Sequence, residues 1–153
     1  CAEARIRIFG RLGLMKDIRP ALREFLLGDS TISGLVTAGS VSRVYPIVLP
    51  QGIKLASVVY TRVSGGGDYH MQGRSGYVRP RVQIAAWAPK ADDAVTLANA
   101  VKDRLDGYSG VMGSGAAQVR VQGVFQSDER EMYDDVVQMY GVMRDYFIHH
   151  EEL

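Results

Sequence analysis

Cysteine is almost absent from this chain, because Cys1 is the only one in 153 residues. A single cysteine cannot form an intramolecular disulfide, which excludes a disulfide-stapled scaffold. It also excludes a zinc site built on cysteine pairs. An N-terminal cysteine is the residue that lipoproteins acylate, but such anchors are usually followed by a polar tether. Residues 5–9 are instead basic and apolar (RIRIF), so a lipid anchor is disfavoured.

An excess of one charge is absent too, since 18 Lys and Arg face 17 Asp and Glu, for a net charge of +1. This balance gives no general electrostatic reason to bind nucleic acid or an anionic membrane. No apolar run approaches the ~18 residues of a transmembrane helix. Glycine, by contrast, is abundant at 17 residues, and 46% of the residues are hydrophobic. These numbers predict one domain with a substantial core and glycine-rich connections.

Motifs of nucleotide, hydrolase and metalloprotease sites are missing from the sequence. The histidines do not suggest a metal site either. His149 and His150 end a predicted strand, where consecutive side chains point to opposite faces, and His70 would have to supply a third ligand from a loop. We therefore expect no metal, no cofactor and no enzymatic activity.

The densest acidic cluster spans residues 128–135, where Asp128, Glu129, Glu131, Asp134 and Asp135 lie close together. We interpret it as a solvated turn between two strands. A contact between subunits is an alternative, because acidic residues can pair with arginines across an interface. Acid–base chemistry on paired carboxylates, which requires one of them to be desolvated, is the enzyme alternative.

Three helices are predicted, over residues 17–27, 30–36 and 90–106. Asp17 is a candidate N-cap, Pro20 lies in the first turn and Gly28 follows the end of the first helix. In the third helix, apolar residues recur with helical spacing, and Asp92 and Asp93 lie in the first turn, where the helix dipole favours them.

Strands are predicted over residues 55–63, 77–87, 118–126 and 136–149, with residues 41–46 as a short extended piece at an edge or in a loop. Residues 64–76 are predicted to form a long hairpin loop, and residues 107–115 a second glycine-rich loop. The last strand is apolar on both faces, so a second subunit could cover one of them. These elements predict a single-domain α+β fold, with a mostly antiparallel sheet of about four strands packed with two to three helices.

The first 14 residues differ from the rest, because they are basic and precede Met15, which opens a well-formed segment. We expect residues 1–14 to be an N-terminal extension, with a basic arm that orders on a partner as the alternative. The α+β domain is expected to span residues 15–153.

Several stretches, taken in order, resemble a phage family. They are PALREFLL at 20–27, RVYP and LPQG within 43–52, VYTRVSG at 59–65, VQIAAWAP at 82–89, LDG at 105–107, QGVF at 122–125 and DER at 128–130. The chain resembles the phage tail-completion, or head–tail joining, proteins over about residues 15–151. One departure is Ala56, where the family pattern leads us to expect a proline.

The resemblance implies a structural virion protein that forms a six-fold ring on the head-proximal end of a tail tube, ends tube polymerisation and joins the tail to the head. The implied partners are further copies of this chain, the major tail tube protein and a neck or head-completion protein. DNA would pass through only as cargo, no membrane is involved, and assembly would occur in the cytoplasm of a bacterial host. Prophages and gene transfer particles use similar parts. A head-side neck protein is the alternative, and a small hydrolase using Asp128, Glu129 or His149 is a weaker one.

Two segments are candidates for the subunit and tail-tube contacts. Tyrosine and arginine are favoured as anchors of interfaces, and both occur in the predicted loop before residue 76. The candidate interface residues are Arg62, Asp68, Tyr69, His70, Met71 and Arg74, together with Asp128, Glu129 and Arg130 in the predicted acidic turn.

Overall fold

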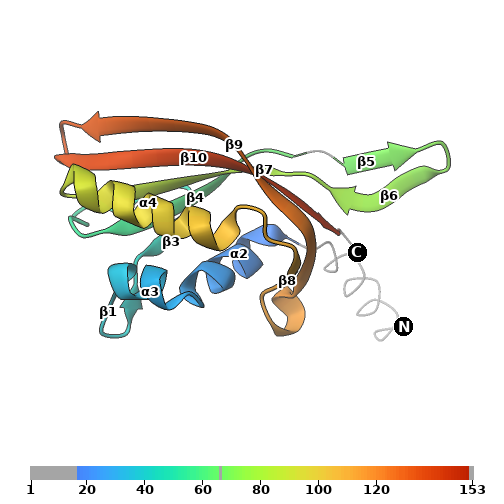
Figure 1. Ribbon diagram of the computed structural model, residues 1–153, viewed down its shortest axis with the longest axis horizontal. Helices are drawn as coiled ribbons and strands as arrows, with labels where there is room; N and C mark the ends of the chain where they lie inside the picture. The colour runs from blue at the N-terminus through green and yellow to red at the C-terminus, as the bar shows by residue number, and fades with distance from the viewer. Residues whose placement is uncertain (1–16, 66, 152–153) are drawn as a thin grey trace, which may run out of the picture.

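The computed structural model describes residues 17–65 and 67–151, and the expected extension at residues 1–14 lies outside them. Within the two described ranges, one large sheet carries three helices against one of its faces (Figure 1). The other face, which we call the open face, is covered by no helix among the described residues. No helix of the described part has the length and apolar character needed to cross a membrane.

The helices lie where the sequence predicts them. They are α2 (Ile18–Leu27), α3 (Ser30–Val36) and α4 (Ala91–Leu105). The carboxylate of Asp17 accepts a hydrogen bond from the backbone N–H of Arg19, and Asp29 in the same way accepts from Thr31 and Ile32. Such N-caps satisfy backbone donors that the first turn leaves unpaired. The neighbouring guanidinium of Arg19 lowers the pKa of Asp17.

The sheet has eight strands, ordered around the long strand β10. They are β3 (Val44–Pro46), β4 (Ser57–Ser64), β5 (Gly67–His70), β6 (Gly73–Val78), β7 (Arg81–Ala88), β8 (Gly110–Met112), β9 (Val119–Asp134) and β10 (Met139–Glu151). One side of β10 pairs with β7 and, at its end, with β6, while the other side pairs with β9. All pairs are antiparallel except β3 with β4, which is parallel. A separate ribbon joins β1 (Thr37–Ala38) to β2 (Val41–Ser42), and a short 3-10 turn, η1, covers Gly115–Ala117.

The expectation of a mostly antiparallel sheet of about four strands is therefore wrong, because the structure contains an eight-stranded mixed sheet. Residues 64–76, predicted as a loop, form most of the β5–β6 hairpin, and the loop predicted at 107–115 contains β8. These strands are short and rich in glycine, so they show no alternation of apolar and polar residues. Their extended conformation depends on pairing with a neighbouring strand, which local sequence does not reveal.

The strand predicted at residues 77–87 is divided at Pro80 into β6 and β7, both of which pair with β10. Proline has no N–H to donate, so a ladder that includes it is interrupted. Its carbonyl oxygen still accepts a hydrogen bond from the N–H of Ile148, at 3.0 Å. The break allows the β5–β6 hairpin to leave the line of the main sheet (Figure 1).

The core lies between the helices and the sheet. Residues of β10 alternate between its two faces, so Val142, Tyr146 and Ile148 pack under the helices and are all at most 3% exposed. Burial raises the pKa of the Tyr146 phenol to about 12, against the opposing effect of the nearby Arg144 charge. The remaining positions of β10 face the open side, where Gly141 lies directly beneath Trp87 of β7.

Replacement of Gly141 by alanine should destabilise the fold by about 1–3 kcal/mol, because the added methyl carbon would lie only 2.9 Å from the Trp87 ring. Urea denaturation followed by tryptophan fluorescence measures the change. Gly34→Ala is the matched control: a methyl group at this position of α3 has open space around it. It should stabilise the protein by about 0.5–1 kcal/mol. Equal stability of the two variants would contradict the close packing at Gly141.

Candidate interaction surfaces

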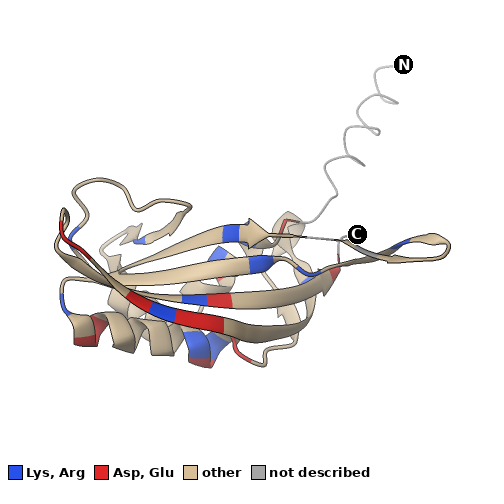
Figure 2. Ribbon diagram, turned by 90° about the horizontal axis from the view of Figure 1, so that it is seen from above, with Lys and Arg blue, Asp and Glu red and all other residues tan. Residues whose placement is uncertain are grey.

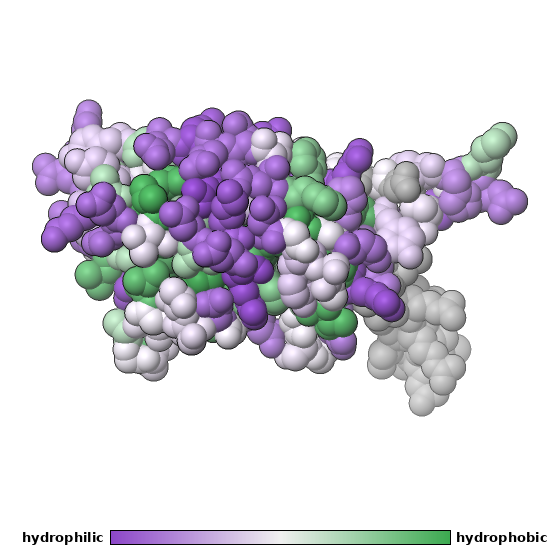
Figure 3. Space-filling view, viewed as in Figure 1, coloured by the Kyte–Doolittle hydropathy of each residue, from purple (hydrophilic) through white to green (hydrophobic). Residues whose placement is uncertain are grey.

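The β5–β6 hairpin projects beyond the main body at one end of the molecule (Figure 1). Within the described residues, Tyr77 and Val78 at its base are the positions that pair with β10, while the rest of β6 pairs with β5. Tyr69 is 70% exposed, and Met71 at the turn is fully exposed. Figure 3 shows apolar atoms at the outer end of the hairpin, beside strongly hydrophilic ones. An exposed apolar tip of this kind is typical of a binding element.

Five of the predicted interface residues belong to this hairpin or its turn. They are Asp68, Tyr69, His70, Met71 and Arg74, and in the register of the hairpin Tyr69 lies opposite Arg74. The sequence assigns these residues to a loop, whereas the structure places them in a hairpin, and their role at an interface stays a prediction. Arg62 lies in β4, is exposed, and extends its guanidinium over the backbone of Gly65.

Asp128, Glu129 and Arg130 form a separate surface, and their predicted location in a turn is wrong. They lie within β9, where they pair with Asp145, Arg144 and Met143 of β10, respectively. Acidic and basic side chains therefore follow one another along this strand (Figure 2). The turn comes later, at residues 135–138. There, the carboxylate of Asp134 accepts hydrogen bonds from the backbone N–H groups of Val136 and Val137.

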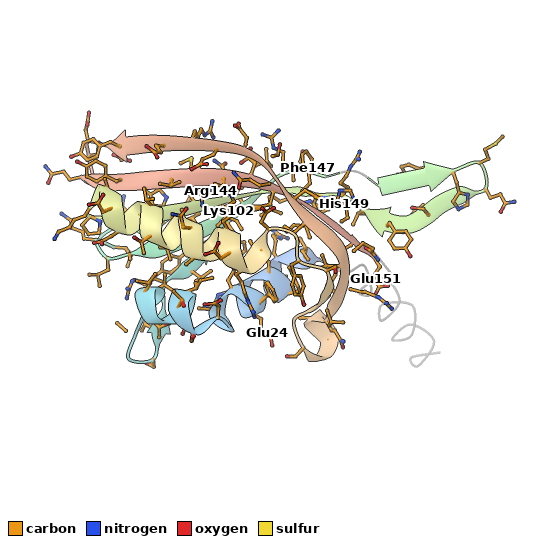
Figure 4. All side chains as sticks on the ribbon, viewed as in Figure 1. Glu24, Lys102, Arg144, Phe147, His149 and Glu151 are labelled. Atoms are coloured by element: carbon orange, nitrogen blue, oxygen red, sulfur yellow. The ribbon has the colours of Figure 1, made fainter. Side chains whose placement is uncertain are left out.

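Glu129 points toward the helices, because its carboxylate accepts a hydrogen bond from Arg144 at 2.9 Å. Arg144 is only 6% exposed and also donates to the carbonyl oxygen of Ala98 and the side chain of Asn99 in α4. This arginine, labelled in Figure 4, joins β9, β10 and α4. Glu129 therefore anchors the fold as well as lying on its surface.

The structure has a groove on the open face, which the sequence does not predict. We call it the open-face groove. It has a volume of about 410 Å³ and lies between the loop of residues 47–53 and strands β4, β7 and β10, with Arg130, Asp134 and Val137 at its border. Its apolar floor includes Val59, Trp87 and Met143. No local pattern reveals such a site, because its walls come from segments as far apart as residues 47 and 143.

The loop over the groove begins with an unusual conformation. Ile47 has a φ of +67°, which is rare for a β-branched residue and costs about 1–3 kcal/mol. Its N–H donates to the carbonyl oxygen of Tyr60 at 2.9 Å, and the N–H of Val48 donates to Pro46 at 2.7 Å. These bonds fix the loop over the sheet. Ile47 and Val48 themselves remain 61% and 68% exposed.

A second hollow, of about 570 Å³, lies at the base of the hairpin, between β6 and the end of β10. Arg79, Phe147 and His149 line it, and Figure 4 labels the last two. The His149 ring packs edge-on against Phe125, with ring centroids 5.2 Å apart. Burial, together with the positive charge of Arg79, lowers the pKa of His149.

The acidic residues considered for the alternative of acid–base chemistry do not form a desolvated pair in the structure. In the ranges that the structure describes, no group of three or more histidine, cysteine or acidic residues is arranged to hold a metal ion. Asp128 and Glu129 are exposed neighbours on a strand, so they point to opposite faces. A hydrolase based on a desolvated carboxylate pair at these positions is therefore not supported.

Comparisons with known proteins identify the family of the chain and a similar fold. A family model described as tail completion protein gp17 matches residues 20–151. The chain belongs to this family and is a structural protein of a phage-type tail. A comparison with curated proteins finds no significant match.

The fold is also similar to a chain in a solved structure titled "Virion of native gene transfer agent (GTA) particle". The two chains share 19% sequence identity with a TM-score of 0.66, and the similarity covers 85% of this chain and 91% of the other. At this identity the match shows that the fold is shared.

The His149 environment leads to a prediction about pH. His149 should titrate below its ordinary pKa of 6.5, and Arg79→Gln should raise its pKa only part of the way, because burial is the larger cause. In the unaltered chain, His149 has a lower pKa in the folded state than in the unfolded state, so the unfolded chain binds the proton more readily. Protonation of His149 should therefore lower the free energy of unfolding as the pH falls through 6.5. Histidine NMR titration measures the pKa, and Arg120→Gln, which replaces an exposed arginine of β9, is the control. An unchanged His149 pKa in Arg79→Gln would contradict the assignment.

Proposed function

We propose that six copies of this chain form a closed ring on the head-proximal end of a tail tube. The ring would occupy the growing end of the tube and offer no equivalent site to another tube subunit, which ends polymerisation. Its outer surface would then receive a neck or head-completion protein. In this role the chain needs no cofactor or catalytic residue, and DNA passes through the ring as cargo.

The family match over residues 20–151 carries this proposal. The structure supports it in two ways. The sheet has one face that no helix covers among the described residues, and a hairpin extends away from the main body. A subunit of a closed ring contacts two neighbours through two different surfaces, and the uncovered sheet face and the hairpin are two such surfaces.

A capping assay tests the role directly. Purified tail tube protein polymerises, and the chain is added in small molar amounts during growth. We expect shorter tubes that bear a ring at one end in negative-stain images. Unchanged tube lengths, combined with binding to filled heads, would contradict capping and favour the alternative of a head-side neck protein.

The mass of the protein in solution provides a second test. Six copies of 16.8 kDa give about 101 kDa, so light scattering over a concentration series should approach this mass. Addition of tube ends should favour the ring if free copies associate weakly. A stable assembly with another number of copies would contradict the hexamer, while the capping role would remain open to the first assay.

The hairpin residues should matter for assembly and not for folding. The double variant Tyr69→Ala with Arg74→Glu should lose about 10- to 30-fold in association, since interface anchors commonly contribute this much. Its melting temperature should stay close to that of the unaltered chain, because Tyr69 is 70% exposed. The matched control is Val111→Ala with Arg120→Glu, another exposed cross-strand pair. Normal assembly of the Tyr69 and Arg74 variant would exclude the hairpin as an interface.

A further inference from the structure

We propose that the β5–β6 hairpin of one copy binds in the open-face groove of a second copy. The proposed partner of the hairpin is thus another molecule of this chain, and the contact runs head to tail. This inference rests on the proposed function, because it takes from it that copies of the chain assemble with one another. The new element is the identity of the two surfaces that contact each other.

Within the part of the chain that the structure describes, the hairpin has an unpaired strand edge and exposed apolar side chains that a partner could cover. A two-stranded hairpin is marginally stable in water, and one edge of β5 has no pairing partner among residues 17–65 and 67–151. Tyr69 and Met71 are large side chains held in solvent at its outer end. Burial of these two side chains would supply hydrophobic stabilisation that the free subunit lacks.

The groove has the properties that these side chains require. Its volume of about 410 Å³ is within the usual range for pockets that enclose a small ligand. Val59, Trp87 and Met143 give it an apolar floor. Hydrogen bonds from Ile47 and Thr61 connect the overlying loop to β4, so the site exists before a partner arrives. A preformed site avoids the loss of entropy that ordering would cause.

The charges of the two surfaces are complementary. Arg62, Arg74 and Arg79 lie on the hairpin or beside its base, where Asp68 is the only acidic residue between positions 62 and 79. On the groove side of β9, Arg130 and Asp134 lie at the border of the groove, whereas Glu129 points toward the helices. An orientation that sets Arg74 of the hairpin against Asp134 pairs opposite charges, whereas one that sets it against Arg130 brings like charges together, so the charges favour one orientation of the hairpin.

The two surfaces lie at opposite ends of the molecule. The hairpin projects from one end, and the β9–β10 turn, whose residue Val137 borders the groove, lies at the other (Figure 1). One molecule therefore cannot fill its own groove with its own hairpin. A contact between different surfaces of identical subunits is heterologous, which is the type of contact that closes into a ring or extends as a filament.

Disulfide cross-linking tests the contact. In a Cys1→Ser background, Met71→Cys is combined with Gln51→Cys, which places one thiol at the hairpin turn and the other in the loop that lines the groove. Both positions are exposed, so folding should not change. Oxidation should produce a ladder of covalent dimers and larger species, because each copy can join two neighbours.

The matched control combines Met71→Cys with Val95→Cys, an exposed position on α4 and outside the groove. We expect at least a tenfold lower yield of species larger than a dimer. Equal ladders in both variants, or none with Gln51→Cys, would overturn the proposal. Cross-linking of Met71→Cys to a tail tube subunit alone would also overturn it, while leaving the capping role intact. Ladders from a chain that fails the capping assay would contradict the proposed function and support this contact.

Discussion

Strand β10 is the constraint on which the other elements depend. It pairs with β7, β6 and β9, so both of its edges are occupied along most of its length. Through Arg144 it also holds α4, since the buried guanidinium donates to the Ala98 carbonyl oxygen and to Asn99 and bonds Glu129 of β9. A buried charge is tolerated only where such partners surround it, so this contact fixes the helix layer relative to the sheet.

The sequence predicts those parts of the fold that local patterns define. The N-cap Asp17 locates the start of α2, and the helical spacing of apolar residues from Ala94 onward locates α4. Both signals depend on residues that are close together in the sequence. It does not predict β5 or β8, whose glycines carry no side-chain pattern and whose strands exist because a neighbour pairs with them. The acidic residues at 128–131 suggest a turn, yet pairing with β10 keeps them extended.

The candidate site shows the same division. Tyrosine and arginine in a glycine-rich segment make residues 64–76 a candidate interface from sequence alone, because these residue types are favoured as interface anchors. The open-face groove could not be found in this way. Its floor joins Val59, Trp87 and Met143 from three strands, and its loop depends on the left-handed conformation of Ile47. Both features are products of the tertiary fold.

The break at Pro80 has a consequence for local stability. Among the described residues, Tyr77 and Val78 pair the β5–β6 hairpin with β10, so the hairpin can open without disturbing the ladder between β7 and β10. Its backbone amides belong to the part of the molecule that exchanges with solvent by local unfolding, whereas those of β7 require opening of the core. Proteases would therefore cut free subunits at the hairpin first. Any assembly that covers the hairpin would shield it, so assembled copies would resist cleavage where free copies are cut.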